Sequence, residues 1–221
     1  MIPILFANED VIAVNKPEGL ASIPAPSAKD SLLSLLSATL SERLYVVHRL
    51  DQEASGVILL ARNAVAHRFL SEQFSGQSVQ KVYVALTHGV ITEGTGVINK
   101  PLREFGSGRI GVDFQRGKPS VTEFRVLERF AAYTLVELYP RTGRRHQLRA
   151  HCYSLGHPIV GDLRYGDRAL QRQFPRLMLH AWRITFALPS GEKVTVEAPF
   201  PESFQAVVKT IRSGQSKVIF T

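Results

Sequence analysis

Hydrophobic and polar positions alternate along the chain in short blocks, and most of the apolar blocks predict strands joined by tight turns. Residues 3–7 and 11–16 are apolar runs separated by three polar residues at 8–10, which predicts a β-hairpin. By the same reasoning we predict further strands at 44–47, 56–61, 78–90, 120–130, 131–140, 177–188 and 193–199. The last two ranges flank the turn sequence PSGE and predict a second hairpin.

Fewer segments carry the wider period of a helix. The stripe formed by Leu148, Cys152 and Leu155 predicts a helix over 144–155 that stops at Gly156. Three other helices are predicted from capping residues: 31–40 after Asp30, 64–74 between Asn63 and Gly76, and 202–212 after Pro201.

The order of these elements predicts the fold class. Strands outnumber helices, many strands join by short turns, and the helices do not alternate with the strands. This argues against a doubly wound parallel sheet and predicts an α+β fold, a mostly antiparallel mixed β-sheet with flanking helices and loops. Residues 89–118 are rich in glycine and weakly periodic, so we expect loops with short strands there. One domain is expected over 1–221.

The composition and the N-terminal sequence indicate the compartment in which the protein is expected. The chain has 221 residues, of which 44% are hydrophobic and 21% charged, the balance of a globular protein that needs no metal or disulfide for its core. Cys152 is the sole cysteine, which excludes an internal disulfide and fits a reducing compartment. The N-terminus has no basic segment typical of a signal peptide, and no apolar run approaches the roughly 18 residues of a membrane span. We expect a cytoplasmic protein.

The charge balance points to a polyanionic partner. The formal net charge is +8, which favours nucleic acid, although a basic enzyme without such a partner is the alternative. Between Arg141 and Arg176 there are eight arginines, no lysine and two acids. Four of them, at 164, 168, 172 and 176, would share one face of a helix, but Gly166 and Pro175 oppose a continuous helix. An ordinary solvated face is the other interpretation.

The sequence gives little support for a metal site, a nucleotide-binding loop or a reactive cysteine. His146, His151, Cys152 and His157 lie close in sequence, but their spacing does not place metal ligands on one helix face. The sequence GSGRIG at 106–111 departs from GxGxxG and lacks a surrounding βαβ unit, so a flexible loop is the better interpretation. Cys152 falls on an apolar stripe and is expected in the core.

The most informative stretch is VVHRLDQEASGVILLA at 46–61, which places charged residues between two apolar runs. Asp51 is either an ordinary turn former or a carboxylate held at the edge of the core for chemistry. A partly desolvated carboxylate needs a cation nearby to stay ionised, and Arg49 or the distant Arg149 could supply it. Tyr83, on the same predicted strand face as Lys81, is a further candidate for a residue of the site.

The chain also resembles the RluA-type RNA pseudouridine synthases. HRLDQEASG at 48–56 resembles the family motif HRLDxxTSG, and the segments VNKPEGL at 14–20 and KVYVAL at 81–86 resemble its KPxG and KxYxA motifs. Residues 142–166 resemble the third motif of the family, and residues 177–186 resemble its closing strand. The resemblance covers nearly the whole chain in order and spacing. Ala54 stands where relatives commonly have threonine, and no S4 module precedes the first strand, as in the short stand-alone members.

The resemblance implies the pseudouridine synthase fold around a central cleft and the isomerisation of uridine to pseudouridine within ribosomal RNA, transfer RNA or both. It implies that Asp51 is the essential carboxylate, that Arg149 is its ion-pair partner, and that Tyr83 stacks on the uracil. No cofactor and no metal are expected, because the reaction is an isomerisation. Contacts with RNA are expected from six residues: Lys16, His48, Arg49, Lys81, Arg145 and Leu148.

A non-catalytic RNA-binding protein on the same fold is the alternative. Such a protein has no need of Asp51, Tyr83 and Arg149, and all three are present. A metal-dependent hydrolase is a more distant possibility. No protein partner is evident, and we expect a monomer because no exposed apolar helix stands out.

Overall fold

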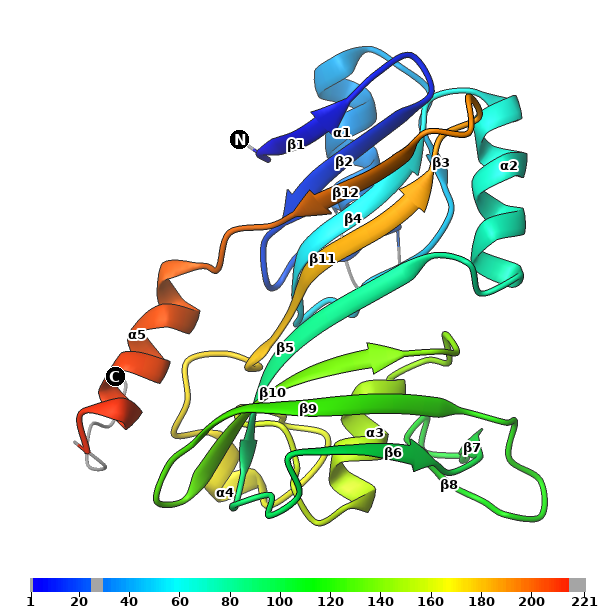
Figure 1. Ribbon diagram of the computed structural model, residues 1–221. Coiled ribbons are helices and arrows are strands. Elements are labelled where there is room, and N and C mark those ends of the chain that lie inside the picture. The colour runs from blue at the N-terminus through cyan, green and yellow to red at the C-terminus, as the bar shows by residue number, and fades with distance from the viewer. Residues whose placement is uncertain (1, 25–29, 215–221) are drawn as a thin grey trace. The chain divides into compact units, whose positions relative to one another are not determined.

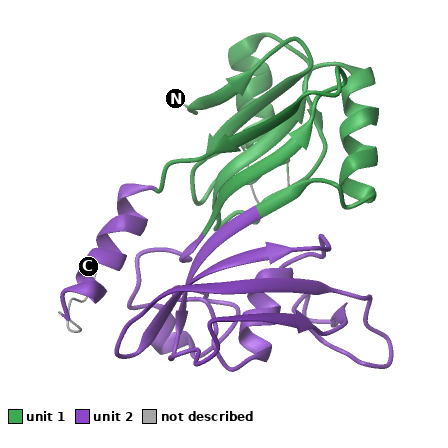
Figure 2. Cartoon of the chain, viewed as in Figure 1, with its two compact units in different colours: residues 1–81, 180–200 green, residues 82–179, 201–221 purple. Residues whose placement is uncertain are grey.

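The computed structural model describes residues 2–24 and 30–214, which form two compact units (Figures 1 and 2). Unit 1 contains residues 1–81 and 180–200, and unit 2 contains residues 82–179 and 201–221. The chain passes from one to the other within strands β5 (Gln80–His88) and β11 (Leu179–Ala187), and again between Phe200 and Pro201. Among the described helices, none combines the length and the apolar character needed to cross a membrane.

Unit 1 is built on a mixed sheet. Its strands follow the order β1-β2-β4-β11, with β3 paired to β4 and β12 paired to β11. The bounds are β1 Ile4–Ala7, β2 Val11–Lys16, β3 Tyr45–Val46, β4 Ser55–Ala61 and β12 Lys193–Glu197. The pairs are antiparallel except β4 with β11, which is parallel through His180–Ser55 and Ala181–Gly56. Both predicted hairpins, β1–β2 and β11–β12, are confirmed.

Strand β4 is central to this sheet, and all seven of its residues are buried. That explains why its sequence is a continuous apolar run rather than an alternating one. Two helices belong to the unit, α1 (Leu32–Leu40) and α2 (Ala64–Ser75), and α2 packs on the sheet through Ala66 and Leu70. Asn63 caps α2 as predicted, since its side chain accepts from the Ala66 amide at 2.8 Å.

The cap predicted for α1 is wrong. Ser31, not Asp30, is the N-cap residue, and its hydroxyl forms a capping box with Ser34. Serine and aspartate both cap well, so adjacent candidates cannot be separated by residue type alone.

Unit 2 holds an antiparallel sheet in the order β5-β10-β9-β6, together with a separate hairpin β7–β8. The strand bounds are β6 Thr95–Asn99, β7 Leu102–Glu104, β8 Ile110–Val112, β9 Val121–Arg129 and β10 Tyr133–Pro140. The helices are α3 (Gln147–Ser154), α4 (Arg168–Gln171) and α5 (Glu202–Arg212). The predicted pairing of the two strands over 120–140 is confirmed.

Three features of unit 2 differ from the predictions. Helix α3 begins at Gln147 rather than 144, because His146 has a left-handed backbone with φ 48°. Leu155 ends that helix and is exposed, so only Leu148 and Cys152 of the three predicted stripe residues are buried, and all residues from 147 to 152 are buried with them. The GSGRIG segment is not only a loop, because it contains the hairpin turn and the first two residues of β8.

The four arginines spaced by four residues do not share a helix face. Helix α4 covers only Arg168–Gln171, and Arg176 is buried while Arg164, Arg168 and Arg172 are exposed. The architecture as a whole is the predicted α+β class, with mostly antiparallel pairing and a parallel pair of β4 with β11.

Candidate active site

Asp51 lies in the segment that connects β3 to β4, and its side chain is half-buried. The residues on both sides of it are fixed through their backbones. The Leu50 carbonyl accepts from the Ser22 hydroxyl at 2.8 Å, and the Leu50 amide donates to the same hydroxyl oxygen at 3.1 Å. The Gln52 carbonyl accepts from the Gly19 amide at 2.9 Å. The carboxylate is therefore carried by a turn with little backbone freedom.

Lys16 adds a buried cation to this turn. Its side chain is fully buried, and Nζ donates to the carbonyls of Pro17 at 2.8 Å, Leu20 at 2.7 Å and Gln52 at 3.1 Å. Three acceptors match the three N–H donors of an ammonium group. Lys16 therefore ties the segment after β2 to the residue that follows Asp51, and its predicted contact with RNA stays a prediction.

His48 joins the start of the turn to the sheet. Its Nε2 accepts from the Leu59 amide at 3.0 Å, and its ring stacks on Phe74 of α2 with centroids 4.5 Å apart. Strand β3 ends at Val46, so the imidazole takes the position where a longer strand would offer a carbonyl to Leu59. Burial, with a smaller contribution from the charge of Lys81, lowers the pKa of His48 to about 3. The ring is thus neutral, with its proton on Nδ1.

The remaining predicted residues of unit 1 differ in exposure. Arg49 is exposed, whereas Lys81 is partly buried, and burial lowers the pKa of its ammonium group. An exposed guanidinium two residues before Asp51 has the reach and the charge for an RNA phosphate. Both contacts with RNA stay predictions.

Tyr83 stands in the first half of β5, with its side chain partly exposed and its backbone opposite Leu138 of β10. The strand becomes fully buried from Val84 to Thr87. Tyr83 is therefore a large aromatic ring at the point where a buried strand reaches the surface of unit 2. This placement suits a ring that stacks on a base.

Helix α3 carries the predicted Leu148 and Arg149, which are 7% and 2% exposed. Gln147 anchors the first turn of the helix, because its Nε2 donates to the Val121 carbonyl at 2.9 Å and to the Thr122 hydroxyl at 3.0 Å. A guanidinium at a buried helix position must be paired, since an unpaired charge there is very costly.

Asp162 is a partner of Arg149. Arg149 Nε donates to Asp162 Oδ2 at 2.8 Å, and Nη2 donates to Oδ1 at 2.8 Å. The Arg149 guanidinium also lies over the ring of Tyr165, 5.4 Å from its centroid. Asp162 is not among the residues predicted from the sequence. The available signal was its place directly after Gly161, as one of two acidic residues in a segment otherwise dominated by arginine.

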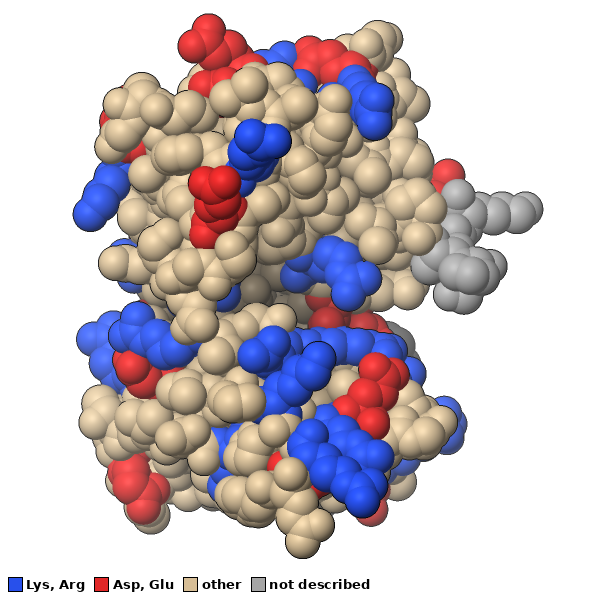
Figure 3. Space-filling view, turned by 90° about the vertical axis from the view of Figure 1, so that its right-hand side faces the viewer, with Lys and Arg blue, Asp and Glu red and all other residues tan. Residues whose placement is uncertain are grey.

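Arg145 is exposed and pairs with Glu104 of β7 at 2.5 Å. Arg144 and Arg164 also contact residues near the β7–β8 hairpin, since they donate to the carbonyls of Pro119 and Gly108. Arg144, Arg145 and Arg164 of the arginine-rich segment thus lie beside the hairpin. Figure 3 shows Lys and Arg side chains gathered over this unit.

The predicted residues fall into two sets. Unit 1 holds Lys16, His48, Arg49, Asp51 and Lys81, and within it the buried Lys16 and the partly buried His48 fix the turn of Asp51. Unit 2 holds the other four, which are Tyr83, Arg145, Leu148 and Arg149.

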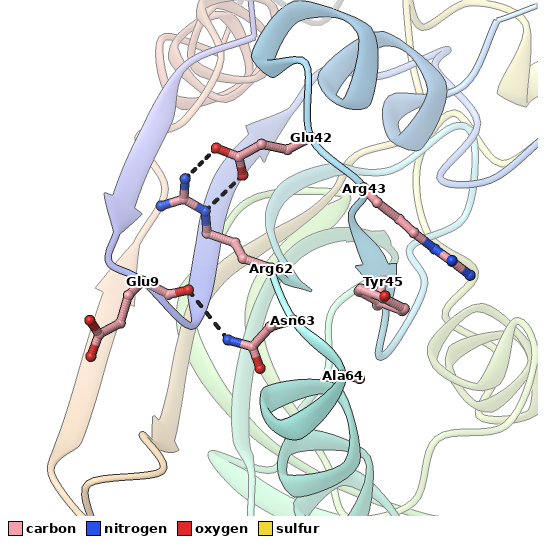
Figure 4. A pocket seen from close by; sticks show the side chains of 7 residues that line it. All are labelled: Glu9, Glu42, Arg43, Tyr45, Arg62, Asn63 and Ala64. Carbon is pink, nitrogen blue, oxygen red and sulfur yellow. Dashed lines mark hydrogen bonds and ion pairs between the residues drawn. The ribbon is translucent and has the colours of Figure 1, made fainter.

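A pocket of about 430 Å³ lies elsewhere in unit 1, at the start of α2 (Figure 4). Its lining residues are Glu9, Glu42, Arg43, Tyr45, Arg62, Asn63 and Ala64. The two arginines are matched by two glutamates, and Arg62 is paired with Glu42 at 2.5 Å. None of the predicted site residues lines this pocket, so its size does not connect it with the chemistry of Asp51.

Comparison with known proteins shows the family to which the chain belongs. The family model described as RNA pseudouridylate synthase matches residues 10–154 of the chain, including the turn of Asp51, Tyr83 and Arg149. The chain belongs to this family. RNA pseudouridylate synthases are isomerases that convert uridine in RNA to pseudouridine, and the chain is therefore an RNA-modifying enzyme. The comparisons do not favour the non-catalytic alternative.

Relatives with curated descriptions cover most of the chain. It is 38% identical to the ribosomal large subunit pseudouridine synthase C of Escherichia coli, over 96% of this chain and 70% of that protein. It is 39% identical to an uncharacterized RNA pseudouridine synthase of Zymomonas mobilis, over 91% of this chain and 94% of that protein.

Solved structures agree with the family assignment. The human RNA pseudouridylate synthase domain containing 1 matches with a TM-score of 0.80 and 29% identity, over 96% of this chain and 95% of that one. Human RNA pseudouridylate synthase domain containing 4 also matches with a TM-score of 0.80, at 28% identity. The predicted fold is thus that of known pseudouridylate synthases.

Proposed function

We propose that Asp51 is the essential carboxylate of this enzyme and that its substrate is a uridine in large-subunit ribosomal RNA. The observation that carries the first part is the turn itself, in which Leu50 and Gln52 are held by Ser22 and Lys16 while the carboxylate between them stays half-exposed. Holding a reactive group in one position lowers the entropic part of the reaction barrier. Relatives described as acting on the ribosomal large subunit support the second part.

The reaction is an isomerisation, so each bond that breaks is balanced by one that forms. The bond between N1 of uracil and C1′ of the ribose breaks, the base turns and C5 joins C1′; C5 then loses its proton and N1 takes one up. Asp51 attacks C1′ or removes a ribose proton, and it gives up that bond or returns that proton as the product forms. Either role requires the carboxylate to be ionised and shielded from water. Arg149 is the cation we propose to hold it ionised and oriented. Tyr83 would stack on the uracil and assist the transfer of its proton.

The target uridine must be flipped out of the stacked RNA before the enzyme can act on it. Flipping a nucleotide costs on the order of a few kcal/mol, so contacts with the backbone must offset that cost. Unit 2 has exposed arginines at 144, 145, 164, 168 and 172, which supply charge suited to phosphates. We propose that Lys16, His48, Arg49, Lys81 and Leu148 complete the binding site around the flipped uridine.

Both units are proposed to form one catalytic domain, since the family model spans parts of each. We further propose a monomeric, cytoplasmic enzyme. The net charge of +8 supports this proposal, because like-charged copies repel one another and the charge favours RNA. Sedimentation of the purified protein with and without RNA tests the monomer.

The substrate is tested by mapping pseudouridines across all stable RNAs from cells with and without this gene. We expect one or more uridines of large-subunit ribosomal RNA to lose their modification in the deleted strain and to regain it with the wild-type gene. Re-expression of the Asp51→Asn variant should not restore them. Loss confined to transfer RNA would contradict the proposed substrate, and an unchanged map would contradict the proposal that any stable RNA is modified.

A further inference from the structure

Asp162 is held at least as firmly as the arginine it contacts. Its side chain is fully buried, and Oδ1 accepts from the backbone amides of Arg164 at 3.0 Å and Tyr165 at 3.2 Å. Behind it, Gln171 Oε1 accepts from the amides of Gly161 at 2.6 Å and Asp162 at 3.2 Å. The carboxylate is therefore fixed by its own loop and does not depend on Arg149 for its position.

The bidentate contact determines how the guanidinium lies. Asp162 takes the edge formed by Nε and Nη2, and the Tyr165 ring covers one face of the group. The planar fork of an arginine has no freedom to rotate once one edge is engaged in two hydrogen bonds. The direction of its terminal edge, formed by Nη1 and the second N–H of Nη2, is then fixed as well.

The burial of this pair is difficult to explain by stability alone. Taking two charges out of water costs about as much as their attraction returns, and well-packed apolar residues in their place are often neutral or better. A buried ion pair is thus weak evidence for stability, and its geometric consequence for Arg149 is the more specific explanation.

We infer that Asp162 is a positioning residue for the reaction: it fixes the orientation of Arg149, the cation proposed to act on Asp51. The inference rests on the proposed function, in which Arg149 is the partner of Asp51. Asp162 itself acts through Arg149 and has no role at the reacting atoms.

The first test is Asp162→Asn, which keeps the shape and an oxygen acceptor but removes the charge-assisted fork. We expect the single-turnover rate on large-subunit ribosomal RNA to fall by about tenfold to a hundredfold, because small misplacements of a catalytic group cost that much. RNA affinity should stay within about threefold, since only the transition state loses an interaction.

The matched control is Glu137→Gln. Glu137 is also buried in unit 2 and pairs with Arg125, whose side chain is exposed: its Oε2 lies 2.9 Å from Arg125 Nε and 2.7 Å from Nη2 and also accepts from the Tyr139 hydroxyl. Loss of that pair should affect thermal stability but leave the turnover rate within about twofold, since it removes no interaction made only in the transition state.

A double-mutant cycle with Arg149→Lys separates positioning from general structure. If Asp162 acts only through Arg149, Asp162→Asn should cause little further loss of rate in the Arg149→Lys background. Losses that multiply, or a wild-type rate for folded Asp162→Asn, would overturn the inference. Should circular dichroism show that Asp162→Asn is unfolded, the same cycle is run with Asp162→Ser. Its hydroxyl can still accept from the two loop amides but cannot reach the guanidinium, and the same outcomes decide.

Different results would contradict the proposed role of Arg149 and the inferred role of Asp162. A full rate for Arg149→Lys and also for Arg149→Ala would contradict the proposed role of Arg149 and remove the basis of the inference. A slow Arg149→Ala together with a full rate for Asp162→Asn would contradict only the role of Asp162.

Discussion

At the scale of single residues, the site depends on side chains that fix others. Asp51, Tyr83 and Arg149 could be selected from the sequence because ordered motifs around them resemble a known family. The roles of His48 and Asp162 could not, because each depends on a partner brought close by folding. Leu59 meets His48 only because β3 ends at Val46, and Asp162 meets Arg149 only because its own loop turns back.

His48 leads to a prediction about pH. Folding lowers its pKa from 6.5 to about 3, so the unfolded chain binds the proton first as the pH falls. The stability that depends on the neutral ring is complete above pH 6.5 and is lost as the pH falls from 6.5 toward 3. The contribution to the slope of unfolding free energy is at most about 1.4 kcal/mol per pH unit.

The comparison that isolates this contribution is with His48→Gln, whose side-chain oxygen can still accept from the Leu59 amide. Urea unfolding between pH 4 and 7 should show a shallower loss of stability toward acid in the variant than in the wild type. Equal slopes for both proteins would show that His48 titrates normally in the folded state.

At the scale of elements, strands were predicted better than helix ends. Alternation and apolar runs identify a strand, and both hairpins and the β9–β10 pair follow from them. Helix α3 starts three residues late because the left-handed backbone of His146 leaves no mark on the apolar pattern. The arginine spacing of four did not produce a helix, since α4 is only four residues long.

Gly161 is the residue on which the loop of Asp162 depends most. It has φ +76°, and a Cβ there would lie 1.8 Å from the carbonyl oxygen of Arg176. Both the backbone conformation and the space therefore exclude a side chain. We expect Gly161→Ala to lower the free energy of unfolding by at least about 2 kcal/mol. The control is Gly143→Ala, where a Cβ would meet nothing within 4 Å. Equal melting temperatures for the two variants would contradict this account of the loop.

At the scale of the whole molecule, the net charge and the α+β class were both accessible from the sequence. The class follows from the order of elements, and the charge of +8 indicates a polyanionic partner, which the family assignment identifies as RNA. The sequence could not show how the arginine-rich segment is placed against the β7–β8 hairpin, because that depends on contacts such as Arg145 with Glu104.

The salt dependence of RNA binding tests the role of the exposed arginines of unit 2. Arg172 is exposed on unit 2, and its replacement by alanine should weaken RNA binding and reduce the slope of log K against log salt by about one contact, or 0.7 to 0.9. Lys193→Ala on β12, an exposed cation of unit 1, is the control and should leave the slope unchanged. A slope unaffected by Arg172→Ala would make the segment ordinary solvated surface.

The central claim is that Asp51 does the chemistry while the surrounding residues hold it. The most direct measurement is the release of tritium from large-subunit ribosomal RNA labelled at C5 of uridine, because C5 loses its hydrogen when it joins C1′. Wild-type enzyme should release the label, and Asp51→Asn should release none above background while binding the same RNA within about threefold. Release by Asp51→Asn at the wild-type rate would contradict the account.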